Sequence, residues 1–107
     1  MKKLPTCILL TLIGALAVPG LALASQALAD KAGCIACHKV DVKLVGPAFK
    51  DVAVKYKTRA DAVPYLMKRV REGGPGNWGM VPMMANDVKR ISDADLKALI
   101  EWILKTK

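Results

Sequence analysis

Two cysteines and the only histidine of this 107-residue chain lie together in the segment Cys34-Ile35-Ala36-Cys37-His38. The spacing is C-x-x-C-H, the attachment signature of a c-type haem. Because positions i, i+3 and i+4 of a helix share one face, both thiols can reach the vinyl groups of a single porphyrin. The imidazole then approaches the iron from the same side. The pattern predicts one covalent haem c held by Cys34 and Cys37, with His38 as an iron ligand.

Three other uses of this segment are weaker interpretations. A thioredoxin-like C-x-x-C motif needs a βαβ context, and the sequence shows no alternating strand pattern. A structural zinc site takes four ligands, whereas the segment offers three. A disulfide between Cys34 and Cys37 would close a very short loop and would leave His38 without a role. The haem interpretation is the one that uses all three side chains.

The second axial ligand of the iron has to come from another residue type, because His38 is the only histidine. Lysine, a terminal amine, water and an open position are possible, but methionine is the simplest choice, since a thioether favours ferrous iron and raises the potential. Met67 falls in a predicted helix, where a core position is the simpler explanation. Met80, Met83 and Met84 lie in a predicted loop. Residue types alone do not choose among these three.

Residues 1–24 have the features of a secretory signal peptide. Two lysines precede an apolar run over 8–18, and Ala22-Leu23-Ala24 forms a small-x-small cleavage site. The apolar run is shorter than the roughly 20 residues that a membrane span needs. We therefore expect cleavage after Ala24, with a second possible cleavage site at 27–29, and no retained membrane anchor. The mature domain, 25–107, would then lie in a bacterial periplasm.

The composition of the mature domain limits what it can be. Without the two lysines of the leader, the 17 basic and 9 acidic residues of the chain leave a net charge of +6. A domain of this size buries only a modest core and needs a cofactor, metal or disulfide to stabilise it. It is too small for a multidomain enzyme, and its basic residues are dispersed, so we expect no nucleic-acid partner. A monomer is the expected state.

The mature sequence predicts an all-α domain of four or so short helices. Apolar residues at helical spacing predict helices over Gln26–His38, Phe49–Tyr56 and Asp61–Glu72, and a last helix after Ser92. Ser25 is a possible N-cap of the first helix, and Ser92 with Asp95 resembles a capping box for the last. A glycine-rich stretch from residue 73 opens a loop through Asp87, and loops of this length are usually functional.

Further motifs resemble those of the small bacterial class I cytochromes c, the c-551/c-552 group. They cover nearly all of the mature domain and are Gly33-Cys34-Ile35-Ala36-Cys37-His38, Val45-Gly46-Pro47-Ala48, Asp51-Val52-Ala53, Gly76-Asn77-Trp78-Gly79, Val81-Pro82-Met83 and Glu101-Trp102-Ile103-Leu104. The resemblance implies short helices wrapped around one covalent haem. The sequence departs from the group after Met83, where Met84-Ala85 replaces the usual Pro-Pro and the stretch to Ser92 is longer.

The resemblance also implies a role for each matching side chain. Met83 would be the distal iron ligand, and the Pro47 carbonyl would accept a hydrogen bond from the imidazole on the other side. Trp78 and Arg69 would contact a haem propionate, and Asn86 would touch the ligand sulfur. Each also has a simpler explanation: Trp78 could only cover the core, Arg69 could be one charge on a solvated helix, and Pro47 could be only a turn residue.

A haem iron ligated by both histidine and methionine has no open position for a substrate. We therefore expect a periplasmic single-electron carrier, not an enzyme. Its expected donor is a membrane complex such as cytochrome bc1, and its expected acceptor a nitrite reductase, oxidase, peroxidase or photosynthetic reaction centre. Basic residues near the haem edge would steer an acidic partner. The competing functions, a five-coordinate sensor or scavenger of NO or CO and a haem peroxidase, both require open iron.

Overall fold

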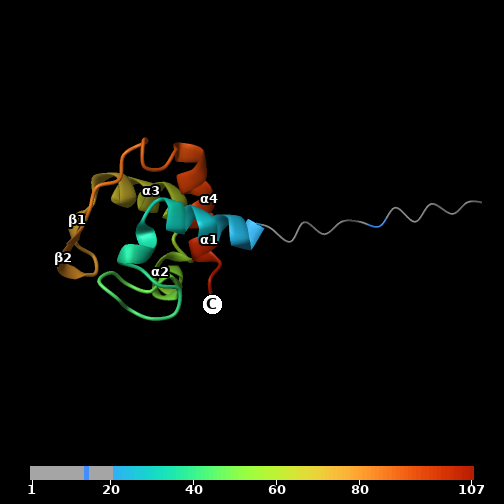
Figure 1. Cartoon of the computed structure of the whole chain (residues 1–107). Helices are drawn as coiled ribbons and strands as arrows, with labels where there is room; N and C mark the ends of the chain where they lie inside the picture. The colour runs from blue at the N-terminus through green and yellow to red at the C-terminus, as the bar shows by residue number, and fades with distance from the viewer. Residues whose placement is uncertain (1–13, 15–20) are drawn as a thin grey trace, which may run out of the picture.

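Four helices, a short 3₁₀ turn and a two-stranded hairpin make up the part of the chain that the structure describes, which is Gly14 and residues 21–107 (Figure 1). In this computed structural model the elements are α1 (Leu21–Lys31), η1 (Cys34–Ala36), α2 (Phe49–Tyr56), α3 (Ala62–Glu72), β1 (Gly74–Gly76), β2 (Gly79–Met83) and α4 (Asp93–Leu104). Of the predicted signal peptide, residues 1–13 and 15–20 lie outside the described residues. None of the helices in the described part is long and apolar enough to cross a bilayer.

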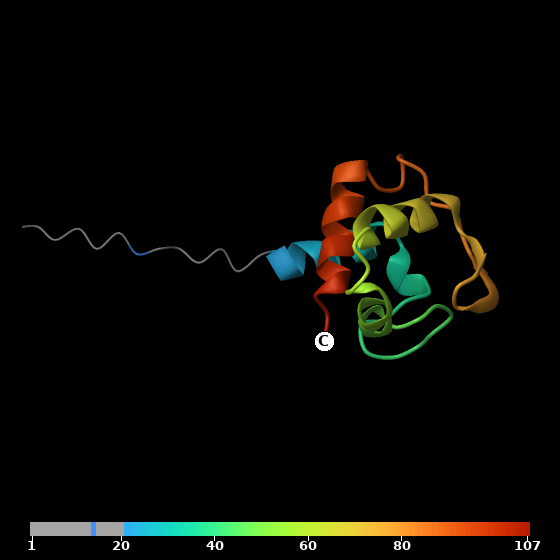
Figure 2. The ribbon, with the colours of Figure 1, turned by 180° about the vertical axis from the view of Figure 1, so that it is seen from behind.

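Helix α4 is the centre of the packing, because α1, α2 and α3 all contact it. Figure 2 shows α4 running across α1, with α2 and α3 beside it. The predicted apolar stripe of this helix is confirmed, since Leu96, Leu99 and Ile100 are at most 2% exposed. The buried core around them comprises Ala29, Ala32, Phe49, Tyr56, Ala62, Leu66 and Ile91. These side chains are mostly small or medium-sized, so the helices alone enclose little apolar volume.

The first predicted helix is wrong in its bounds. Helix α1 ends at Lys31, and Gly33 adopts φ 80°, a left-handed conformation that side chains other than glycine rarely take. The chain then restarts as the short turn η1. Ser25 is not an N-cap, because it lies inside α1 and is 7% exposed. The attachment segment nevertheless stays compact, since the backbone N–H of His38 donates to the carbonyl of Cys34 over 2.9 Å.

The other predicted helices are confirmed. Helix α2 has the expected bounds, and α3 begins one residue after Asp61, which takes the N-cap position. Ser92 caps α4, with its hydroxyl oxygen accepting the backbone N–H of Asp95 over 3.2 Å. Local apolar spacing was therefore sufficient to locate these three helices, and only α4 among them has a side-chain N-cap hydrogen bond.

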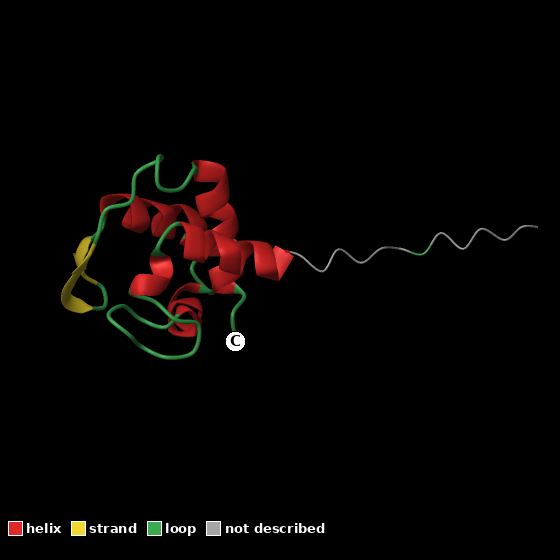
Figure 3. Ribbon diagram, viewed as in Figure 1, coloured by secondary structure: helices red, strands yellow, loops and turns green. Residues whose placement is uncertain are grey.

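The prediction of an unstructured loop after α3 is wrong, because strands β1 and β2 pair there as an antiparallel hairpin (Figure 3). Gly74 is the register partner of Met83, and Gly76 that of Gly79. The strands have no alternating apolar pattern, and all three glycines have positive φ, so the sequence carries no ordinary strand signal. The pairing places Met83 beside the C-terminal end of α3.

Candidate functional site

A cavity of about 340 Å³ lies among the helices, the hairpin and the loop that precedes α2. Its volume is in the range of roughly 300–1,000 Å³ that is typical of cofactor pockets. Every site residue predicted from the sequence contributes to its lining: Cys34, Cys37, His38, Pro47, Arg69, Trp78, Met83 and Asn86. The elements therefore bring together residues that are far apart in the sequence. We call residues 33–49 the proximal wall of this cavity and residues 73–87 its distal wall.

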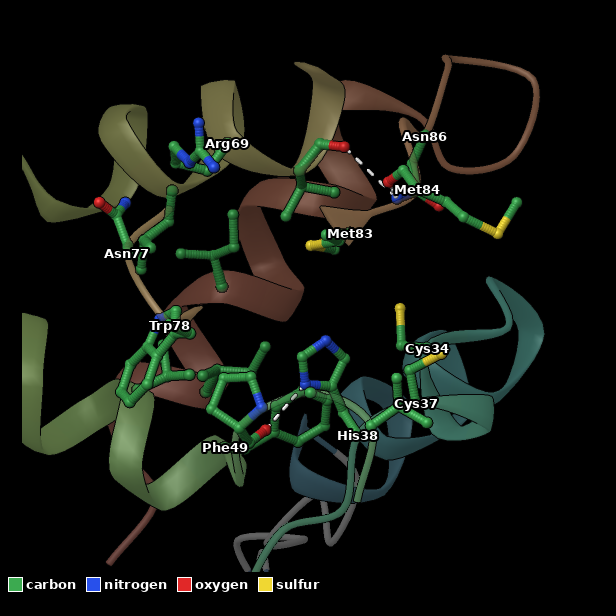
Figure 4. A pocket seen from close by; sticks show the side chains of 18 of the residues that line it. Cys34, Cys37, His38, Phe49, Arg69, Asn77, Trp78, Met83, Met84 and Asn86 are labelled. Carbon is green, nitrogen blue, oxygen red and sulfur yellow. Dashed lines mark hydrogen bonds between the residues drawn. The ribbon is translucent and has the colours of Figure 1, made fainter. Parts of the chain in front are cut away.

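The two cysteines of the proximal wall are free, half-buried thiols at the mouth of the cavity (Figure 4). Turn η1 holds them on one side of the pocket, as the attachment of a single porphyrin requires. Burial raises the pKa of the Cys34 thiol above its ordinary value, and the positive charge of Arg90 opposes part of that effect. The structure does not join the two cysteines to each other.

The imidazole of His38 is fixed from three directions. Its Nδ1 lies 2.8 Å from the carbonyl oxygen of Pro47, to which it donates, because a carbonyl can only accept. The ring stacks on Phe49 with centroids 5.3 Å apart and an interplanar angle of 18°. Gly46 lies against the ring, and a Cβ there would be 2.8 Å from Nδ1. These contacts leave Nε2 pointing into the cavity, toward Met83 (Figure 4).

The three methionines of the distal wall differ sharply in their surroundings. Met80 is 92% exposed and Met84 is 69% exposed, whereas Met83 is half-buried. In Figure 4 the sulfur of Met83 lies in the cavity across from His38, and the side chain of Met84 extends away from it. The geometry therefore supports Met83, of the three, as the partner of His38 across the cavity.

The end of α3 supports the backbone of Met83 directly. Gly73 has φ 65°, and a Cβ at this position would lie 2.5 Å from the carbonyl oxygen of Met83 and 2.7 Å from the amide nitrogen of Ala85. A side chain would meet backbone atoms there, which cannot move aside as a flexible side chain can. Glycine therefore allows α3 and the distal wall to approach this closely.

The two residues expected to contact a propionate line the rim of the cavity, on the side away from Cys34 and Cys37 in Figure 4. Trp78 is 43% exposed, packs edge-on against Tyr56 and has the Nζ of Lys55 at 4.5 Å from its ring centroid. Arg69 is half-buried, and among residues 21–107 no carboxylate lies within salt-bridge distance of it. A half-buried guanidinium without a carboxylate partner suits the acidic group of a bound cofactor.

Asn86 is only 8% exposed and uses its side-chain amide to hold the backbone. Its Nδ2 donates to the carbonyl oxygens of Met84, over 2.9 Å, and Val70, over 3.3 Å. Its own backbone N–H also donates to Val70, over 3.1 Å. Both amide hydrogens thus go to main-chain carbonyls. A contact between Asn86 and the Met83 sulfur stays a prediction.

Several side chains that support the distal wall are not predicted by the sequence. Lys55 donates to the carbonyl of Asn77 over 2.8 Å, and the Asn77 amide donates to the hydroxyl of Tyr65 over 2.6 Å. Arg71 donates to the carbonyls of Asn86 and Asp87. No local signal marked these residues, because each partner lies 12 or more residues away along the chain.

The donor set fits a haem c well. Two thiols, an imidazole with a free ring nitrogen, a thioether and a rim guanidinium line one largely apolar cavity. Thiols attach the porphyrin, nitrogen and sulfur suit its iron, and the cation suits its acidic substituents.

Known proteins agree with this assignment. The cytochrome c family profile matches residues 22–107. Cytochrome c-552 of Nitrosomonas europaea is 50% identical over 93 residues, covering 87% of this chain and 88% of that protein. Cytochrome c-551 of Allochromatium vinosum is 50% identical over 90 residues, covering 84% and 94%. The crystal structure of wild-type Nitrosomonas europaea cytochrome c552 matches with a TM-score of 0.71, covering 77% of this chain and 99% of that one. The chain belongs to the cytochrome c family, in the class I c-551/c-552 group, and it is an electron carrier, not an enzyme, that holds one covalent haem c through Cys34 and Cys37.

Proposed function

We propose that this cytochrome c carries single electrons in the periplasm, with His38 and Met83 as the two axial ligands of its iron. One observation carries the proposal: Nε2 of His38 and the sulfur of Met83 face each other across the cavity that the two cysteines border (Figure 4). A site with both axial positions taken leaves no room for a substrate at the metal. Reversible electron transfer is the chemistry that remains.

The residues around His38 prepare it to bind metal. The hydrogen bond from Nδ1 to Pro47 fixes the tautomer, so that Nε2 carries the lone pair. The same bond makes the imidazole a stronger donor, as hydrogen bonds to ligating histidines generally do. Phe49 and Gly46 prevent the ring from tilting. The ligand therefore does not need to reorganise when the iron changes its charge.

On the distal wall, Met83 would exclude water from the iron. The bound haem supplies a one-electron couple between ferric and ferrous iron, and thioether ligation raises its potential. Arg69 and Trp78 at the rim would hold a propionate. Two observations support this: both residues line the cavity, and among residues 21–107 no carboxylate lies within salt-bridge distance of Arg69. A fixed propionate keeps its negative charge at a constant distance from the iron.

The partners would meet the protein at the open rim of the cavity. Exposed apolar side chains border it, Val45 at 53% and Val81 at 65%, and Lys43 also lines it. A small apolar contact with basic residues around it suits a brief encounter with an acidic redox partner. We propose a membrane donor such as cytochrome bc1 and a terminal acceptor of the nitrite reductase, oxidase, peroxidase or reaction-centre class. The periplasmic location rests on the signal peptide predicted at residues 1–24.

An absorption spectrum of the purified protein tests this function. The proposal predicts that the ferric form shows the weak red band that reports sulfur on the iron, and that the ferrous form does not bind carbon monoxide at neutral pH. The alternative is a five-coordinate sensor of small ligands. That alternative predicts the reverse on both counts, and such a result would overturn the electron-carrier proposal.

A further inference from the structure

The guanidinium of Arg71 connects three parts of the molecule. Arg71 lies in the last turn of α3, and its side chain is 21% exposed. Its Nη1 donates to the carbonyl of Asn86 over 3.1 Å and to that of Asp87 over 3.0 Å. Its Nη2 donates to a carboxylate oxygen of Asp93, in the first turn of α4, over 2.6 Å. One side chain thus ties α3, the end of the distal wall and α4 together.

The segment held by Arg71 follows directly on Met83. The two carbonyls belong to the third and fourth residues after it. Burial contributes little in between, since the side chain of Met84 is 69% exposed and Ala85 is exposed as well. This stretch contains no proline that would stiffen it. Its position therefore depends on hydrogen bonds from the residues at the end of α3.

Two neighbours of Arg71, Val70 in α3 and Gly73 just after it, cooperate with Arg71. The Val70 carbonyl accepts the backbone N–H of Asn86, and Gly73 packs on the backbone of Met83. These are neutral contacts, whereas the bonds of Arg71 carry a full charge, and charge-assisted hydrogen bonds are about twice as strong as neutral ones. Of the contacts that keep this segment on α3, those of Arg71 are thus expected to be the strongest.

We propose that Arg71 is a positioning residue for the distal ligand: it holds the backbone after Met83 on α3 and so keeps the thioether in the cavity. The proposal rests on the proposed function, in which Met83 binds the iron. Arg71 itself does not line the cavity. Its effect therefore passes entirely through the segment that carries Met83.

Competition with free imidazole tests this role in the ferric holoprotein. Imidazole can bind the iron only when the thioether leaves, so its apparent affinity reports how firmly Met83 is held. In Arg71→Gln, we expect imidazole to bind about tenfold more tightly than in the wild type, because the charge-assisted hydrogen bonds that hold the segment after Met83 are lost. Arg71→Lys, which keeps the charge but not the fork of donors, should show a smaller increase.

Lys68→Gln is the matched control, because it removes a positive charge from the same helix. Lys68 is exposed, and its one ion pair within the described part of the chain is with Glu72, over 3.9 Å. The imidazole affinity of this variant should stay within about twofold of the wild type. Equal affinities for Arg71→Gln and Lys68→Gln would overturn the proposal. If Arg71→Gln does not yield holoprotein, Asp93→Asn replaces it in the test. We expect this variant to bind imidazole more tightly than the wild type, by a smaller factor than for Arg71→Gln. An imidazole affinity equal to that of the wild type would contradict the proposal.

A double variant shows whether Arg71 acts through Met83. In a Met83→Ala background there is no thioether to hold, so adding Arg71→Gln should leave the imidazole affinity unchanged. A persisting effect would mean that Arg71 acts on the proximal wall or on the whole fold. If Met83→Ala alone binds imidazole no better than the wild type, Met83 is not the ligand, and the proposed function fails together with this role.

Discussion

The proximal and distal walls hold their metal-binding side chains in different ways. On the proximal wall, His38 bonds to Pro47 only nine residues away, and the stacked ring of Phe49 is close in sequence as well. On the distal wall, supporting hydrogen bonds come from side chains 12 to 22 residues away, those of Tyr65, Arg71 and Lys55. One ligand is positioned by local sequence and apolar stacking, and the other by distant polar contacts.

This difference predicts which wall of the cavity opens first when the protein is perturbed. Apolar packing against a buried ring resists displacement, because interiors are close-packed. The distal wall is glycine-rich and largely exposed, and local opening begins in such regions. We therefore expect disturbances of the proximal wall to damage the fold. Disturbances of the distal wall should open the iron site first.

The largest effect is expected from removing both attachment points. Cys34→Ala with Cys37→Ala deletes the thioethers that keep haem in the cavity, and the core of small side chains cannot replace the lost apolar contacts. The chain should then be largely unfolded, with far-ultraviolet circular dichroism showing little helix. A helical, cooperatively melting apoprotein would show that the haem is not the centre of the core.

The second-largest effect is expected from the loss of the distal ligand. Met83→Ala should open the iron to carbon monoxide and lower the potential by a sizeable part of the roughly 0.8 V span over which axial ligands act. Met84→Ala is the matched control, because this neighbouring side chain is 69% exposed and points away from the cavity. Its spectrum and potential should match the wild type. If Met84→Ala removes the sulfur signal instead, the wrong methionine has been assigned.

A pair of glycine variants compares the two walls directly. In Gly46→Ala, the new Cβ meets the His38 ring and should destabilise the fold by about 1–3 kcal/mol, measured by denaturant unfolding of the ferric protein. In Gly73→Ala, the new Cβ meets the Met83 backbone. The ferrous iron of this variant should therefore bind carbon monoxide more readily than that of the wild type, while the free energy of unfolding should fall less than in Gly46→Ala. If carbon monoxide binds Gly46→Ala more readily than Gly73→Ala, the proposed difference between the walls is wrong.

The smallest effect is expected outside both walls, at the exposed pair of Arg59 and Asp61. Their hydrogen bond of 2.5 Å lowers the pKa of the Asp61 carboxyl. Its folded pKa lies below the unfolded one, so the pair stabilises the protein above the unfolded pKa, and the contribution disappears as pH falls through the folded pKa. Arg59→Gln should raise the pKa of Asp61 toward its ordinary value in an NMR titration, and Lys97→Gln should not. An unchanged pKa in Arg59→Gln would show that the pair is not formed in solution.

The features that the sequence predicted best are those that depend on residues close together along the chain. Apolar spacing and the Ser92 cap located α4, and the attachment segment identified Cys34 and Cys37. The hairpin could not be predicted, because its glycines, with positive φ, carry no strand pattern. Arg71 could not be predicted either, since its partners become neighbours only after α3, the distal wall and α4 have packed. Residue types also could not choose among the loop methionines, whereas the fold exposes Met80 and Met84.

X-ray absorption at the iron edge of the purified ferric protein tests the central claim most directly, because it counts the atoms bound to the metal. We predict a single sulfur opposite an imidazole nitrogen in the wild type and in Met84→Ala, and no sulfur in Met83→Ala. A first shell without sulfur in the wild type, or one that keeps its sulfur in Met83→Ala, would contradict the assignment of Met83 as the distal ligand.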